Sequence, residues 1–244
     1  MRLGIGVFLM AAVSLSAQQY SVLVFSKTTG FRHASIPNGI AAIQQLGAKN
    51  GFSVTATEDS SLFTVANLAK YKAVVFLSTT GDILDADQKA AFESYIHKGG
   101  GFAGVHAATD TEYKWPFYGK LVGAYFLSHP KIQTATVDVT DRTHPSTAAL
   151  PATLTRTDEW YNFRVNPRGQ VHVLAVVDEK SYTGGTMGDH PVAWCHEFEG
   201  GRAWYTAMGH TEESYTEPLF LDHLLGGIRS AAGVVPANCA VSKP

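Results

Sequence analysis

Short apolar runs alternate with longer amphipathic segments along the first half of the chain. The runs rich in valine, leucine and phenylalanine predict strands over residues 21–25, 52–57, 73–77 and 102–105. The segments between them predict helices over residues 36–50, 63–70 and 85–98. Pro37 and Asp85 are typical of helix starts. This alternation predicts an α/β fold with a doubly wound, mostly parallel sheet flanked by helices.

The second half of the chain has a different pattern. Residues 113–122 predict a helix, and residues 132–139 and 171–177 predict strands of an inserted β-rich segment. Gly200 and Gly201 separate apolar runs over 192–198 and 203–208, which predicts a hairpin. A last helix is expected over 217–232. The pattern predicts one domain over residues 18–233 and a C-terminal tail over residues 234–244.

The N-terminus has the pattern of a secretory signal peptide over residues 1–17. Arg2 precedes an apolar run over residues 3–13, and small residues follow that run up to Ala17. The run is too short to span a bilayer, although it could instead be an extra strand or helix of the fold. We therefore expect an exported protein, periplasmic or secreted, that has no membrane partner after the signal is cleaved.

Two cysteines, Cys195 and Cys239, follow the predicted signal. They permit one disulfide but no disulfide framework. Cys195 lies inside an apolar strand pattern, where a buried free thiol is at least as compatible with the sequence.

The composition of the chain excludes some classes of protein and of binding partner. The chain has 244 residues, of which 45% are hydrophobic and 16% charged, and this composition excludes a disordered protein. Its net charge of −2 gives no basic surface for nucleic acid. Ten histidines are many for this length, and histidine transfers protons and binds metals near neutral pH.

Three of these histidines lie in loops that follow predicted strands. They are His33, His106 and His210. In open α/β sheets, ligands bind beyond the carboxyl ends of the strands, so we expect the three side chains to converge there. The alternative is that each one caps a helix or faces solvent. The carboxylates of Asp110, Glu159 and Glu212 belong to the same or neighbouring loops.

His106 occupies the centre of the sequence Gly104-Val105-His106-Ala107-Ala108. Small residues around a central one, at a turn from strand to helix, are typical of a nucleophile elbow. A histidine in this position excludes the acyl-enzyme chemistry of a serine or cysteine elbow. It leaves proton transfer or metal binding for the side chain.

Several motifs in order resemble the ThuA-like family, which is named for trehalose utilisation. They are residues 30–36, 99–110, 158–163, 194–197 and 209–212, which read GFRHASI, GGGFAGVHAATD, DEWYNF, WCHE and GHTE. The resemblance covers residues 20–233 and implies a fold similar to flavodoxin and to class I glutamine amidotransferases. Those amidotransferases carry a cysteine where this chain has His106, so we do not expect glutamine hydrolysis.

The resemblance implies a carbohydrate substrate, because the family is associated with bacterial disaccharide use that proceeds through keto-sugars. We assign catalytic roles to three residues, which are His106, His210 and Glu159. We assign substrate-binding roles to five others, which are His33, Asp110, Trp160, Tyr113 and Glu212. Aromatic residues can stack on sugars, but these could equally pack the inserted segment onto the sheet.

The sequence does not fix the cofactor. Histidines and carboxylates could hold a divalent metal such as zinc, but no short ligand spacing points to one. No Gly-x-Gly-x-x-Gly follows the first strand, so a nicotinamide enzyme is not expected. His129 and His190 each precede a proline, and a structural role in a turn is favoured for both.

The leading hypothesis is an exported carbohydrate-metabolism protein that binds or transforms a sugar or keto-glycoside in a histidine-rich cleft. As an enzyme it would be a glycoside-modifying hydrolase or lyase, acting by histidine acid–base or metal-assisted chemistry. The alternatives are a non-catalytic sugar-binding module and an oligomerisation scaffold. A homo-oligomer is compatible with all three hypotheses.

Overall fold

The structure is a computed structural model that describes residues 20–241. The predicted signal peptide over residues 1–17 lies outside the described residues, so it stays a prediction. None of the helices within residues 20–241 is long and apolar enough to cross a membrane.

The first half of the chain forms the parallel part of a nine-stranded sheet. Its strands lie in the order β2-β1-β3-β4, with bounds Phe52–Thr57, Tyr20–Phe25, Ala73–Leu77 and Gly101–Val105. Every residue of β3 and β4 is buried, because helices cover both faces of this part of the sheet. The predicted fold class is confirmed.

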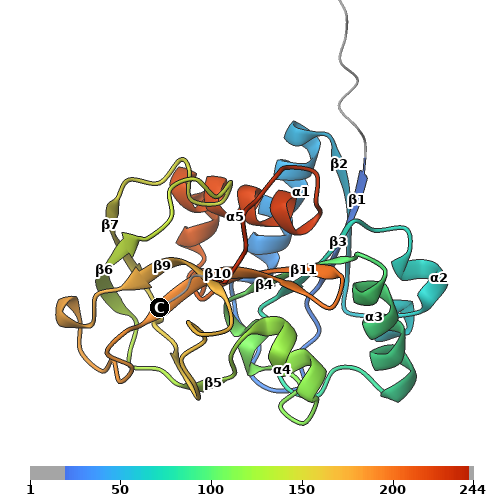
Figure 1. Cartoon of the computed structure of the whole chain (residues 1–244), viewed down its shortest axis with the longest axis horizontal. Coiled ribbons are helices and arrows are strands. Elements are labelled where there is room, and N and C mark those ends of the chain that lie inside the picture. The colour runs from blue at the N-terminus through green and yellow to red at the C-terminus, as the bar shows by residue number, and fades with distance from the viewer. Residues whose placement is uncertain (1–19, 242–244) are drawn as a thin grey trace, which may run out of the picture.

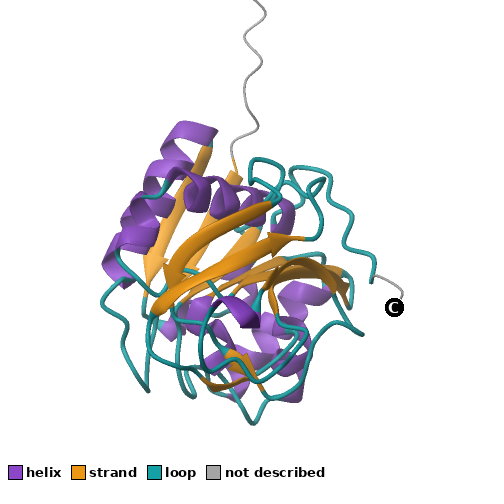
Figure 2. Ribbon diagram, turned by 90° about the vertical axis from the view of Figure 1, so that its left-hand side faces the viewer, coloured by secondary structure: helices purple, strands orange, loops and turns teal. Residues whose placement is uncertain are grey.

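Helices pack on both faces of the sheet, as Figures 1 and 2 show. α1 (Ile36–Asn50) and α5 (Pro218–Ala231) contact each other on one face. α3 (Ala86–His97) and α4 (Pro116–Val122) lie on the other face (Figure 1). Asp85 and Gln88 form a reciprocal capping box at the start of α3, which confirms the helix start predicted at Asp85.

Two predicted helices are shorter in the structure. Residues 63–70 contain only α2 (Val65–Leu68), which follows a 3-10 turn at Ser60–Leu62. The helix predicted from residue 113 begins at Pro116, because the residue before a proline is held extended and Trp115 has that conformation.

The second half of the chain extends the sheet with antiparallel strands. β11 (Gly201–Thr206) pairs parallel to β4, and the predicted hairpin joins it to β10 (Pro191–Phe198). The sheet then continues through three further strands, which are β9 (His172–Val177), β6 (Gln133–Val139) and β7 (Thr153–Asp158). β5 (Phe126–Ser128) and β8 (Asn162–Phe163) form a separate two-stranded sheet.

The pattern of β7 is polar, so hydrophobic alternation does not define its bounds. Its buried positions Arg156 and Asp158 carry opposite charges and pair with each other at 3.0 Å. An inward-facing ion pair takes the place of the apolar residues by which a half-buried strand is recognised.

The two cysteines form a disulfide between Cys195 on β10 and Cys239 in the tail. Of the two states that the sequence left open, the structure therefore has the disulfide rather than the buried free thiol. The bond fastens part of the C-terminal tail to the sheet.

Candidate functional site

His106 lies where β4 turns into the short 3-10 helix His106–Asp110. Its φ of 49° is in the left-handed region, which is uncommon for a residue other than glycine and typical of a nucleophile elbow. Gly104 makes the turn possible, since a Cβ there would lie 3.0 Å from the ring of Tyr205 and 3.2 Å from the Cβ of Ala108. The elbow predicted from the small neighbours of His106 is present.

A backbone hydrogen bond fixes the orientation of the His106 ring. Nδ1 lies 2.8 Å from the carbonyl oxygen of Ala207, and because a carbonyl only accepts, Nδ1 carries the proton and donates it. In the neutral imidazole, Nε2 then presents its lone pair to the other side. This nitrogen lies 3.0 Å from His210 Nδ1 and 3.5 Å from an oxygen of Glu159.

Four side chains from four separate segments meet at this point, and we call them the His/Glu cluster. They are His33 after β1, His106 after β4, Glu159 after β7 and His210 after β11. One ligand atom from each residue lies within 4.8 Å of the others. The ring centroids of the three histidines are separated by 4.8, 5.0 and 5.1 Å. The predicted convergence of these histidines is therefore confirmed.

A buried carboxylate, Asp158, holds the loop that carries His210. Its two oxygens accept hydrogen bonds from the backbone N–H groups of Gly209, at 2.9 Å, and His210, at 3.0 Å. Arg156 donates to the same carboxylate at 3.0 Å. Asp158 was not among the predicted site residues, although it begins the motif over residues 158–163, because its partners are backbone N–H groups of a distant loop.

The protonation states of the cluster differ from one residue to the next. Burial would raise the pKa of Glu159, but hydrogen bonds and positive charge from His106 and His210 outweigh it and hold that pKa well below its usual range. Burial would lower the pKa of His210, but the Glu159 carboxylate raises it overall. Burial, together with the nearby His106 and His210, lowers the pKa of His33 to about 3. At neutral pH the Glu159 carboxylate is therefore ionised and His33 is neutral, while the raised pKa of His210 extends its protonated form toward higher pH.

Further side chains surround the His/Glu cluster on its open side. His129 Nδ1 lies 3.0 Å from Glu159 Oε1, with 42% of the His129 side chain exposed. The ring of Tyr161 packs against His106 with centroids 4.3 Å apart. Phe31 is 67% exposed and meets the His33 ring edge-on at 4.9 Å. His129 thus reaches the cluster from a loop for which a turn role was favoured, whereas His190 is buried and pairs with Glu179.

Four other predicted site residues lie outside the cluster. The Tyr113 hydroxyl donates to Asp110 at 2.5 Å, so these two residues pair with each other. Trp160 is fully buried, and its indole N–H donates to the carbonyl of Gln133, so its ring has no exposed face for a sugar. Glu212 is exposed at the start of a 3-10 helix. Ligand-binding roles for these residues stay predictions.

The His/Glu cluster fits a divalent metal such as zinc. Zinc bonds of about 2.0–2.1 Å in a tetrahedron place neighbouring ligand atoms about 3.3 Å apart. The separations among His106 Nε2, His210 Nδ1 and Glu159 Oε2 are 3.0, 3.1 and 3.5 Å. His106 also donates its other ring N–H to a backbone carbonyl, as metal-binding histidines commonly do. Nδ1 of His33 is buried without a hydrogen-bond partner, which leaves it free to bind an ion.

Comparisons with known proteins agree with this fold. The chain matches a family model described as ThuA, trehalose utilisation, over residues 21–231. A ThuA-like protein from Bacteroides uniformis is 25% identical, with a TM-score of 0.75 over 92% of this chain and 94% of that chain. A ThuA-like protein from Parabacteroides merdae is 19% identical, with a TM-score of 0.74 over 88% and 90% of the two chains.

A more distant likeness extends to one part of a larger enzyme. A β-galactosidase from Bacillus circulans sp. alkalophilus is 13% identical, with a TM-score of 0.59 over 88% of this chain but only 31% of that chain. At this identity the likeness shows the fold alone. None of the curated proteins matches this chain in sequence.

Proposed function

The chain belongs to the ThuA (trehalose utilisation) family, and on that premise we propose that it is an exported protein that binds and transforms a sugar or keto-glycoside at the His/Glu cluster. The observation that carries this proposal is the elbow at His106. A strained backbone there holds one imidazole nitrogen toward Glu159 and His210. Residues held in such conformations concentrate at functional sites.

The cluster suits proton transfer on a substrate that carries a carbonyl group. The Glu159 carboxylate raises the pKa of His210 and so stabilises its protonated form. In that form the Nε2–H of His210, which makes no hydrogen bond to any described residue, can donate to a substrate oxygen. His106 presents the lone pair of its Nε2 beside this group, because its Nδ1 donates to the carbonyl of Ala207, so this nitrogen can accept a proton. A proton donor beside a proton acceptor is the arrangement that acid–base catalysis requires.

This arrangement acts on the carbon next to a carbonyl group. A carbonyl acidifies the neighbouring C–H bond, so one group removes that proton while another protonates the carbonyl oxygen. The resulting enol either isomerises or expels a leaving group one carbon further along, which gives lyase chemistry on a keto-glycoside. The three imidazoles and Glu159 are mostly buried, which limits the access of water to the reacting atoms.

A divalent metal would be held by His33, His106, Glu159 and His210. When bound, the ion would act as a Lewis acid that polarises a sugar carbonyl or hydroxyl oxygen. Glu159 is ionised and His33 is neutral, which are the states that metal binding needs, whereas a protonated His210 would have to release its proton to bind the ion.

The test is a comparison of two histidine variants. His106→Asn removes the elbow imidazole, whereas His97→Asn removes an exposed histidine at the end of α3 that pairs with Glu199. With a keto-disaccharide as substrate, we expect His106→Asn to lower turnover by about 10²–10⁴-fold and His97→Asn to leave it unchanged. Binding of the keto-disaccharide without turnover would instead identify a non-catalytic sugar-binding module. The absence of both binding and turnover in the wild type would contradict the proposal.

A further inference from the structure

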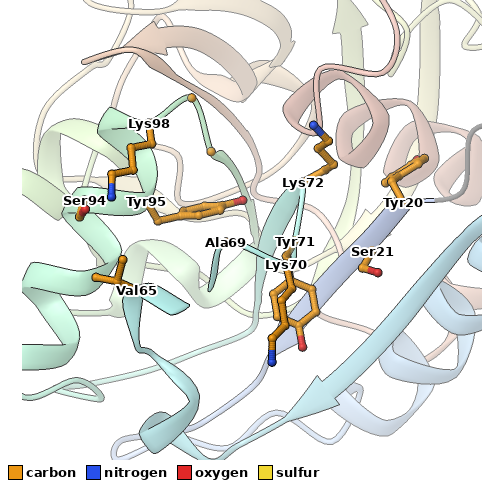
Figure 3. A pocket seen from close by; sticks show the side chains of 12 residues that line it. Tyr20, Ser21, Val65, Ala69, Lys70, Tyr71, Lys72, Ser94, Tyr95 and Lys98 are labelled. Atoms are coloured by element: carbon orange, nitrogen blue, oxygen red, sulfur yellow. The ribbon is translucent and has the colours of Figure 1, made fainter. Parts of the chain in front are cut away.

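A cavity lies at the edge of the sheet opposite the His/Glu cluster. Its volume is about 410 Å³, within the range of small-molecule sites. The start of β1, the turn between α2 and β3, and the end of α3 with the glycine turn into β4 form its walls (Figure 3). It therefore lies at the amino ends of the parallel strands, whereas the His/Glu cluster lies beyond their carboxyl ends.

The walls of this cavity carry positive charge without a counterion. Lys70, Lys72 and Lys98 line it, and no aspartate or glutamate does. Among the residues that the structure describes, none of the three lysines forms an ion pair, and the one side-chain hydrogen bond they make is from Lys70 to Asn67. The chain as a whole has a net charge of −2, so this concentration of cations is local. An unpaired cluster of cations beside a cavity attracts an anion.

Hydrogen bonds hold the cavity open in a fixed shape. The Tyr95 hydroxyl donates to the carbonyl of Gly101 at 3.2 Å and accepts from the backbone N–H of Gly101 at 3.1 Å. Backbone hydrogen bonds from Lys72 to Ser21 and from Gly101 to Lys72 join the strands that form the floor. A site formed in advance loses little conformational entropy when a ligand binds.

Aromatic side chains also line the cavity. Tyr20 and Tyr71 are half-buried there, whereas the Tyr95 ring is buried and stacks on Phe92. The ammonium groups of the three lysines occupy separate places around the cavity in Figure 3. This spacing suits a ligand that is broader than a bare ion.

We propose that this cavity binds a small organic anion of the sugar-phosphate class. The phosphate group would contact the lysine ammonium groups, and the hydroxylated ring would lie against the tyrosine rings. This site is independent of the His/Glu cluster, because the two share no residue and lie at opposite edges of the sheet.

Calorimetric titration with glucose 6-phosphate tests the proposal. We expect the wild type to bind it, and to bind unphosphorylated glucose and inorganic phosphate more weakly. Replacing two cations with Lys72→Gln and Lys98→Gln together should weaken binding by about tenfold, since each exposed charge pair contributes only a few-fold. Lys131→Gln, at an exposed lysine outside the cavity, should leave binding unchanged.

Two outcomes would overturn the inference. One is the absence of binding of glucose 6-phosphate by the wild type up to about 10 mM ligand. The other is binding that the double lysine variant retains in full, which would place the ligand elsewhere. A thermal unfolding measurement on each variant separates loss of binding from loss of fold. His106→Asn serves as a second control, because it should not affect this cavity.

Discussion

The carboxylate of Asp158 is expected to stabilise both the fold and the position of His210. Its Oδ1 accepts backbone hydrogen bonds from Glu159 and His210, and its Oδ2 accepts from Gly209 and Arg156, all within 3.0 Å. Asp158→Asn converts one of these oxygens into an NH₂ group. Each oxygen accepts two hydrogen bonds, so whichever oxygen is replaced, two of the four N–H donors then face an NH₂ group that cannot accept.

The size of the effect follows from these contacts. Each hydrogen bond to a charged group contributes about 1.5–3 kcal/mol, so two losses predict a fall of about 3–5 kcal/mol in the free energy of unfolding. Urea unfolding followed by circular dichroism measures this change. Asp82→Asn is the matched control, because Asp82 is 57% exposed and lies 3.7 Å from Lys114, so its loss should cost less than about 1 kcal/mol.

A second measurement connects this carboxylate to the site. Because Asp158 holds the loop of His210, folded Asp158→Asn protein should also lose turnover of a keto-disaccharide. If the two variants unfold at the same urea concentration, Asp158 is not the support that its contacts indicate, and the reasoning is refuted.

Three further predictions concern single contacts. Glu159→Gln should lower the pKa of His210, measured by NMR titration of its ring, because the carboxylate is what raises that pKa; an unchanged pKa would show that Glu159 does not interact with His210 in solution. Cys239→Ser opens the disulfide to Cys195 across 44 residues and should lower the free energy of unfolding by roughly 4 kcal/mol in a urea titration, whereas an unchanged midpoint would mean that the thiols are not joined. Phe31→Ala should raise the KM for a keto-disaccharide several-fold with little change in kcat, and Phe31→Trp should preserve KM, because an exposed ring beside the cluster is placed to stack on a sugar; equal KM values for Phe31→Ala and wild type would exclude this role.

The convergence of the three histidines could be predicted because it depends on topology. His33, His106 and His210 each follow a strand of the parallel part of the sheet, and the ends of such strands meet at one edge. The elbow at His106 was recognisable from the small residues around it. Both the convergence and the elbow follow from the order of strands and turns along the chain, so neither prediction depended on a measured distance.

The remaining contacts depend on strands that the pattern does not reveal. β7 brings Glu159 to the cluster and Asp158 beneath the loop of His210, but its buried residues are charged. Glu159 lies in the cluster, whereas the neighbouring Trp160 is fully buried, as alternating side-chain directions allow. The approach of His129 depends on the path of an irregular loop, which hydrophobic periodicity does not describe.

The central claim is that the His/Glu cluster transfers protons on a keto-glycoside. Incubation of a keto-disaccharide with the protein in D₂O tests it most directly, with NMR used to follow the hydrogen on the carbon next to the carbonyl group. We expect wild-type protein to exchange this hydrogen for deuterium and His106→Asn, although folded, to exchange it about 10²–10⁴-fold more slowly. Exchange at the same rate with both proteins, or no exchange above the rate in buffer with the wild type, would contradict it.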